Sequence, residues 1–119
     1  MVACADLLAS VDITKIESEK SIHVYEALKE GSYKTASNHY YSLGVKSFDN
    51  KNWEDVITQL TKCVEYDPEK VYAWYALGVS HKSVNNNVNN EISKRCLNKV
   101  IELAPYTTYE KWAKKALED

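Results

Sequence analysis

The residues best suited to chemistry in this sequence are its three cysteines, Cys4, Cys63 and Cys96. Their odd number and wide separation do not describe a disulfide framework. They also lack the close pairwise spacing of the cysteine and histidine ligands that hold a structural zinc ion. Cys63 falls on the apolar stripe of an expected helix, where a cysteine behaves as a small hydrophobic residue. We therefore expect no catalytic thiol, no bound metal and a reducing compartment.

The remaining polar candidates are equally dispersed. His23, His39 and His81 lie far apart, and no HExxH sequence is present. The Asp- and Asn-rich stretch 49–52 lacks the glycine and the closing glutamate of a calcium-binding loop. No G-x-x-x-x-G-K stretch marks a phosphate-binding loop. The sequence thus predicts a protein that is not an enzyme and needs no cofactor.

The composition is that of one globular, helical domain. Of 119 residues, 45% are hydrophobic and 27% charged, and three Gly and two Pro leave little room for the turns of a β fold. The net charge of −2, without a basic cluster, argues against nucleic acid as a partner. No apolar run is long enough to span a membrane. We expect a cytoplasmic protein, with a membrane-anchored parent protein left open.

The pattern of apolar residues and helix-ending signals divides the chain into helices. Residues 1–32 are expected to form an N-terminal helical segment or cap, in which one helix starts at the Thr14–Glu17 capping box and stops at Gly31. Further helices are expected over residues 33–48, 53–66, 71–84, 91–103 and 107–117. Pro68 and Pro105 end two of them, because the residue before a proline disfavours the helical region.

An internal repeat connects these helices. The segment Tyr-Tyr-Ser-Leu-Gly-Val at 40–45 matches Trp-Tyr-Ala-Leu-Gly-Val at 74–79, which lies 34 residues later. The segment Val-Glu-Tyr-Asp-Pro at 64–68 matches Ile-Glu-Leu-Ala-Pro at 101–105, which lies 37 residues later. The second unit therefore carries three extra residues, which we expect in the Asn-rich turn 85–90 because surface turns tolerate insertion.

This pattern resembles the tetratricopeptide repeat family, whose 34-residue unit places a large residue, Leu-Gly and a closing Pro in two helices. Residues 37–70 match one unit without a gap, residues 71–105 match a second, and 107–117 would be the capping helix. The resemblance implies an all-α domain over residues 33–119, with antiparallel hairpins stacked in a right-handed superhelix between capping helices. Gly44 and Gly78 would let the two helices of each hairpin approach closely.

In this family the first helices of successive units line a concave groove that binds other proteins. Carried over to this chain, the groove is formed by Asn38, Tyr41, Val45, Phe48, Tyr72, Tyr75, Val79 and Lys82. These residues are mostly aromatic or aliphatic, so the resemblance implies an apolar groove for a peptide or partner helix, without the Lys, Arg and Asn set that binds acidic chaperone tails. Two other occupants stay open, namely the chain's own N-terminal helix and a second copy in a homodimer.

Overall fold

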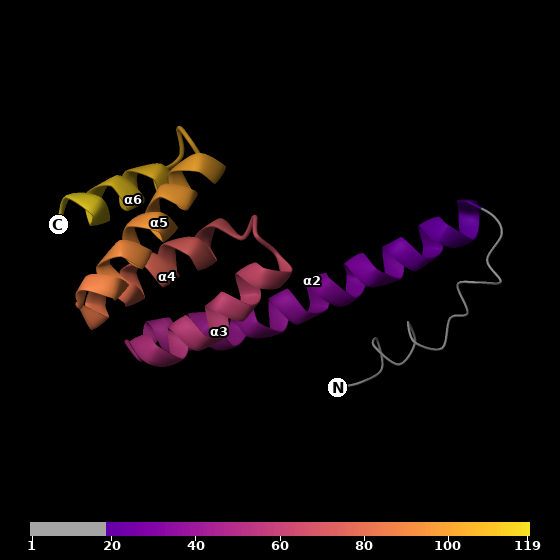
Figure 1. The fold of residues 1–119 in the computed structure, drawn as a ribbon, viewed down its shortest axis with the longest axis horizontal. Coiled ribbons are helices and arrows are strands. Elements are labelled where there is room, and N and C mark those ends of the chain that lie inside the picture. The colour runs from indigo at the N-terminus through magenta and orange to yellow at the C-terminus, as the bar shows by residue number, and fades with distance from the viewer. Residues whose placement is uncertain (1–18) are drawn as a thin grey trace.

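The computed structural model describes the backbone of residues 19–119 and the side chains from residue 28 onward. This part of the chain forms helices and contains no strand, so the predicted all-α class is confirmed (Figure 1). The expected helix start at Thr14, and Cys4, lie outside the described residues. The helices are α2 (Glu19–Asp49), α3 (Trp53–Tyr66), α4 (Val71–Val84), α5 (Asn87–Leu103) and α6 (Thr108–Glu118).

Local sequence signals set most helix ends. The Asn52 side chain accepts a hydrogen bond from the Asp55 backbone N–H at the start of α3. Thr107 does the same for Glu110 at the start of α6, as the predicted capping box requires. Helices α3 and α5 both end two residues before a proline, which confirms the ends predicted from Pro68 and Pro105.

The predicted helix stop at Gly31 is wrong, because α2 continues through this residue as one helix of 31 residues. No glycine in residues 19–119 has a positive φ, so Gly31 does not adopt the left-handed conformation of a helix cap. A helical glycine costs only about 1 kcal/mol relative to alanine, which the good helix formers at 26–30 help to offset. The proposed boundary between residues 32 and 33 stays a prediction, and it now falls inside α2.

The Asn-rich segment 85–90 holds the three extra residues as predicted, but most of it is helix and not the turn that we expected. Helix α5 begins at Asn87, four residues before the predicted start at Glu91, and has 17 residues where α3 has 14. The turn shrinks to Asn85, which has a left-handed φ of 58°, and Asn86, whose side chain caps α5. Asparagine is favoured at both helix ends, so consecutive asparagines can end one helix and start the next. The insertion therefore lengthens the helix.

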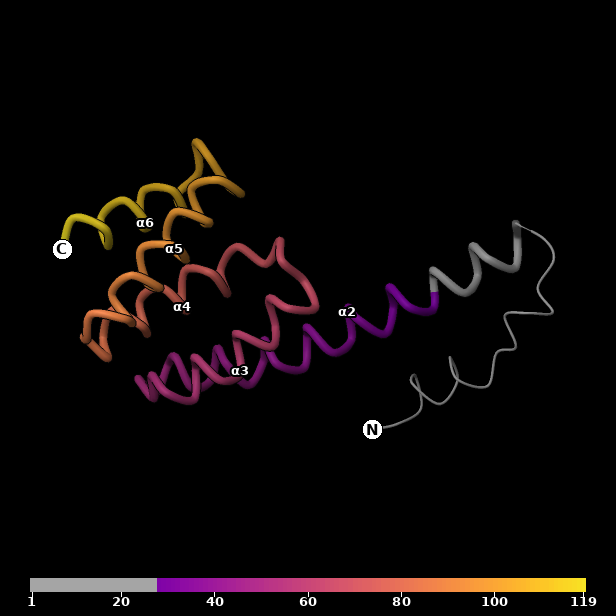
Figure 2. The backbone as a smooth tube through the Cα atoms, viewed as in Figure 1, coloured from indigo at the N-terminus to yellow at the C-terminus, as the bar shows by residue number. Residues whose placement is uncertain are grey.

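Each helix packs against the next one along the chain, and α4 also contacts both α2 and α6 (Figures 1 and 2). In the hairpins α2/α3 and α4/α5 a leucine lies over a glycine: Leu60 over Gly44, and Leu97 over Gly78. Leu60 and Leu97 are at most 1% exposed. The alternating helices α2, α4 and α6 consequently lie side by side along one face, while α2 extends beyond the end of α3 (Figure 1).

Candidate functional site

The main candidate site is a continuous run of aromatic rings across α2, α4 and α6. Five ring pairs with centroids 5.4–6.5 Å apart connect it, running from Tyr41 and Phe48 through Tyr72 and Tyr75 to Trp112 and Tyr109. Three of the five pairs are edge-to-face, a geometry that adds about 0.5–1.5 kcal/mol per pair beyond burial. We call this surface the aromatic face; its members are Tyr41, Phe48, Tyr72, Tyr75, Tyr109 and Trp112.

The helical period explains why these rings converge. On α4, Tyr72, Tyr75 and Val79 follow one another at intervals of three and four residues, so they occupy one side of the helix. Tyr41, Val45 and Phe48 repeat this spacing on α2. Because α4 lies between α2 and α6, its rings reach both neighbours: Tyr72 contacts Tyr41 and Phe48, and Tyr75 contacts Trp112.

The structure brings together four of the eight residues predicted to line the groove, namely Tyr41, Phe48, Tyr72 and Tyr75. The other four are placed around them. Asn38 is exposed beside Tyr41, whereas Val45 and Val79 are half-buried. Lys82 lies at the far end of α4, where its Nζ donates to the carbonyl oxygen of Ala116 on α6 at 2.6 Å.

The sequence reasoning missed the contribution of α6, which supplies Tyr109 and Trp112. Trp112 is 44% exposed. It is the most accessible ring of the aromatic face, because the other five rings are half-buried. A signal for both residues was present in the sequence. They follow Tyr72 and Tyr75 by 37 residues, which is the same offset that relates the two Pro-terminated helix ends.

The aromatic face carries little charge, and its hydroxyl groups are partly desolvated. Burial raises the pKa of the Tyr41 hydroxyl above its usual value, and Tyr109 and Tyr72 raise it further. Burial likewise raises the pKa of Tyr72, with Asp49 and Tyr75 adding to the effect. These tyrosines therefore stay neutral, and they can both donate and accept hydrogen bonds.

One cation borders this surface at the α2 end. Lys70 Nζ lies 4.8 Å from the centroid of the Tyr41 ring and donates to Asn38 Oδ1 at 2.9 Å. A lysine held over a ring contributes about 0.5–1 kcal/mol where both groups are exposed. Lys70 and Asn38 thus give the aromatic face a polar edge.

A second group of exposed apolar side chains covers the outer side of the α2/α3 hairpin. The ring centroid of Tyr66 lies 5.8 Å from that of Tyr33 and 6.2 Å from that of Tyr40, on which the Tyr66 ring stacks. Leu43 follows Tyr40 one turn further along α2. We call Tyr33, Tyr40, Leu43 and Tyr66 the end face. Leu43 is 40% exposed, whereas Leu77, which occupies the same repeat position 34 residues later, is 2% exposed beneath α3. The end face is therefore a packing surface without a neighbour among the described residues.

The residues first considered for chemistry are mostly part of the core. Cys63 is fully buried, and Ser37 Oγ lies 3.1 Å from its carbonyl oxygen. Burial raises the pKa of Cys63, and it raises that of Cys96 to about 11, so neither thiol is activated. His81 is 8% exposed, and its Nδ1 lies 2.6 Å from Asn89 Oδ1. Within the described residues, no three potential metal ligands come together.

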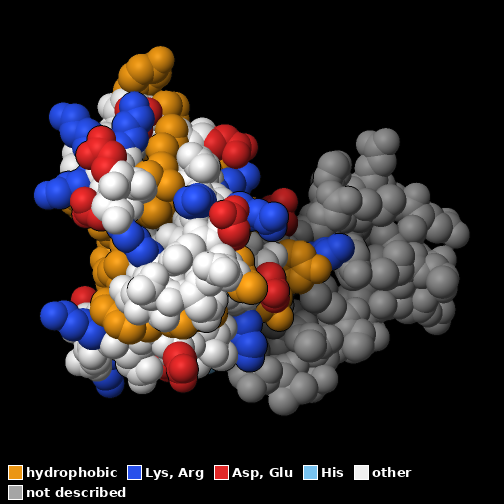
Figure 3. Space-filling model, turned by 60° about the vertical axis from the view of Figure 1, so that its left-hand side comes forward, with side chains coloured by type: hydrophobic (Ala, Val, Ile, Leu, Met, Phe, Trp, Pro, Cys, Tyr) orange, Lys and Arg blue, Asp and Glu red, His pale blue; other side chains and the backbone are white. Residues whose placement is uncertain are grey.

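Comparison with protein-family models, with curated proteins and with solved structures found no match. None of the helices within residues 19–119 is long and apolar enough to cross a membrane. On the face drawn in Figure 3, Lys and Arg side chains are interspersed with Asp and Glu, and no single-sign field dominates it.

Proposed function

We propose that this chain is a protein-interaction module of the tetratricopeptide type, and not an enzyme, which binds a peptide or partner helix on its aromatic face. The single observation that carries this proposal is the unbroken run of six rings across three helices. Trp112 is exposed and the other five rings are half-buried, so together they leave a contiguous apolar surface of the kind that other molecules often cover. Aromatic residues also dominate the binding energy of most protein interfaces.

Several features support the tetratricopeptide arrangement. The two glycine–leucine contacts recur at matching positions, with Gly44 against Leu60 and Gly78 against Leu97. The alternating contacts of α4 with α2 and α6 are those expected of stacked hairpins in a right-handed superhelix. In this arrangement α6 is the capping helix, and the aromatic face lines the concave groove.

The composition of the aromatic face defines the partner's chemistry. Half-buried rings offer apolar contact, and neutral tyrosine hydroxyls offer hydrogen bonds at low entropic cost. Lys70 already donates to Asn38, and Lys82 donates to Ala116, so these lysines are engaged within the domain. We therefore propose a partner segment with apolar or aromatic anchor residues rather than an acidic tail.

Selection of peptides from a random 12-residue library displayed on phage tests the proposal. A synthetic peptide from the selection should lose at least tenfold in affinity towards Tyr75→Ala and towards Trp112→Ala, which remove two adjacent rings of the aromatic face. Tyr66→Ala is the matched control, because Tyr66 is 41% exposed but belongs to the end face. Peptides that bind all three variants as tightly as the wild type would contradict the proposal.

Self-association is the second candidate function, and the exposure of Leu43 favours it. The equivalent Leu77 is covered by α3, so the end face offers an incomplete packing surface that a second copy could complete. Light scattering over a range of protein concentrations would detect a dimer that Leu43→Glu dissociates. Val88→Glu is the control, because Val88 is 69% exposed at the start of α5, away from the end face. A wild-type protein that is monomeric at all concentrations would exclude this candidate.

A further inference from the structure

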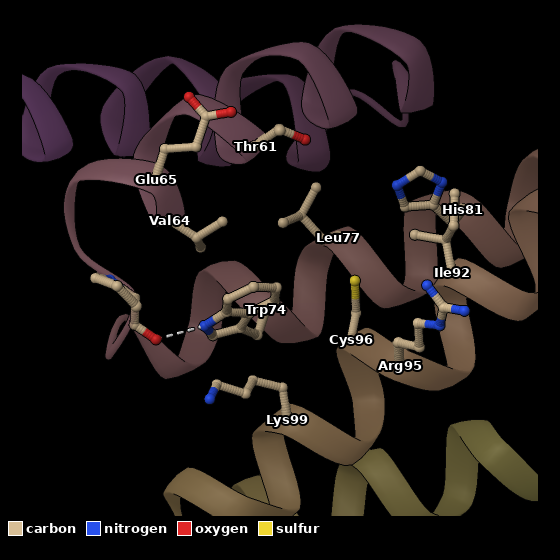
Figure 4. Close-up of a pocket in the computed structure, with 11 residues that line it drawn as sticks. Thr61, Val64, Glu65, Trp74, Leu77, His81, Ile92, Arg95, Cys96 and Lys99 are labelled. Atoms are coloured by element: carbon tan, nitrogen blue, oxygen red, sulfur yellow. Dashed lines mark hydrogen bonds between the residues drawn. The ribbon is translucent and has the colours of Figure 1, made fainter.

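Helices α3, α4 and α5 line a cavity of about 760 Å³ that is open to solvent, on the side of α4 turned away from the aromatic face (Figure 4). This volume falls within the range of pockets that hold small organic molecules, about 300–1,000 Å³. The cavity borders Trp74, Leu77 and His81 of α4, which share one side of the helix. Tyr72 and Tyr75 point from the other side, so the cavity and the aromatic face are separate surfaces.

The contact between α4 and α5 explains why this space stays open. Leu97 covers Gly78, and Ser93 Oγ donates to the Gly78 carbonyl oxygen at 2.7 Å, which fixes α5 against α4. Ile92, Cys96 and Lys99 then face α3 across the cavity, where Val64 forms the opposite wall. The inner surface is apolar, formed by Val64, Trp74, Leu77, Ile92 and Cys96.

The rim of the cavity is electropositive. Arg95 is exposed and makes no ion pair within residues 28–119. Its side chain extends along the cavity next to Ile92 (Figure 4). Lys99 extends beneath Trp74, and its Nζ lies 3.4 Å from Glu102 Oε1. Glu65 is the only carboxylate among the lining residues, and Figure 4 shows it pointing away from the cavity.

From this combination we propose that the cavity binds a small anionic amphiphile, with its hydrocarbon part against the apolar walls and its carboxylate at Arg95. An arginine on the rim suits this ligand because its planar guanidinium can hold a carboxylate with two hydrogen bonds. Ligand binding in the cavity does not depend on peptide binding, because the cavity and the aromatic face share no residue. It assigns a ligand class to a surface on which the repeat resemblance places no site.

Isothermal titration calorimetry with three ten-carbon probes tests the proposal. Decanoate, used below its micelle concentration, should bind more tightly than decanol, and decyltrimethylammonium should bind most weakly. Lengthening the carboxylate probe by one methylene should tighten binding by about three- to fourfold, the effect of ~0.8 kcal/mol for each buried methylene. Equal binding of the cationic and anionic probes would overturn the electrostatic part of the proposal.

Two variants locate the bound probe. Arg95→Gln should weaken decanoate binding by about threefold to tenfold and leave decanol unchanged, since only the carboxylate contact is lost. Lys94→Gln is the matched control, because Lys94 is a neighbouring exposed lysine that does not line the cavity and pairs with Glu91 instead. Thr61→Phe, at the exposed rim on α3, should reduce the affinity for all three probes by occupying the entrance.

Other outcomes would refute the assignment. If Tyr75→Ala abolishes decanoate binding and Thr61→Phe does not, the probe binds the aromatic face and the cavity is not its site. If decanoate fails to bind but an acidic peptide binds in an Arg95-dependent manner, the site accepts a protein carboxylate, and the small-molecule proposal is wrong. Unchanged thermal unfolding of the variants establishes that each result reports binding rather than loss of the fold.

Discussion

Substitution of Gly78 by alanine tests the packing of the second hairpin, because the expected sign is opposite to that at an ordinary helical glycine. At an open helical site this change raises stability by about 0.5–1 kcal/mol. A Cβ on Gly78 would lie 2.7 Å from Leu97 Cγ and 2.8 Å from Leu97 Cδ2. Ordinary carbon–carbon contacts are ~3.5–4.0 Å, so the added methyl group overlaps a side chain that is only 1% exposed.

Overpacking of this kind costs about 1–3 kcal/mol, which exceeds the gain in helix propensity. We therefore expect Gly78→Ala to destabilise the domain by about 1 kcal/mol, and Gly78→Leu to prevent folding. Urea unfolding followed by circular dichroism at 222 nm measures the difference. In a Leu97→Val background the cost of Gly78→Ala should shrink, since the smaller side chain leaves more room.

Gly31→Ala is the matched control. Gly31 is also helical, but a Cβ there would meet no atom within 4 Å. This variant should therefore lose no stability and should show equal or greater helicity. If Gly78→Ala stabilises the domain as an open glycine would, the close packing of α4 on α5 is refuted.

Three further predictions follow from buried polar groups. Ser80→Ala should raise the free energy of unfolding by about 1 kcal/mol, because Ser80 Oγ is buried without a hydrogen-bond partner among the described residues. A variant less stable than the wild type would show that this hydroxyl group does have a partner. Burial raises the pKa of Cys96 to about 11 from the usual 9.0. In a Cys4→Ser protein at pH 8, Cys96 should therefore react with Ellman's reagent at least 100-fold more slowly than a free thiol, until urea unfolds the domain. Rapid modification of the folded protein would contradict this burial. The free energy of unfolding should fall as the pH rises through 10, because the pKa values of Tyr41 and Tyr72 are raised in the folded state and the unfolded chain ionises first. Tyr72→Phe should make this fall less steep. A free energy of unfolding that increases from pH 9 to 11 would contradict the prediction.

The sequence predicted those features that depend on local signals. The repeated Leu-Gly pairs, the prolines after two helices and the Thr107 capping box each act over a few residues, and the corresponding elements lie where they were expected. The resemblance to the tetratricopeptide repeat placed Tyr41, Phe48, Tyr72 and Tyr75 on one surface, and helical spacing puts the two residues of each helix on the same side.

The errors arose where a residue is compatible with two structures. Glycine ends many helices, but Gly31 follows the good helix formers at 26–30, and a Cβ at this position would contact nothing. The asparagines of residues 85–90 were interpreted as a turn, although two of them suffice to end α4 and start α5. Trp112 joins the aromatic face through the packing of α6 against α4, and only the 37-residue offset from Tyr75 pointed to it in the sequence.

The most direct test of the proposed function is the response of the tryptophan indole N–H resonances to a selected peptide. Trp112 belongs to the aromatic face, whereas Trp74 lies on the other side of α4, where its Nε1 donates to the Pro68 carbonyl oxygen at 2.7 Å. In ¹H–¹⁵N spectra we expect the Trp112 indole peak to shift with added peptide and the Trp74 peak to stay in place. A shift of Trp74 with an unchanged Trp112 would contradict the assignment of partner binding to the aromatic face.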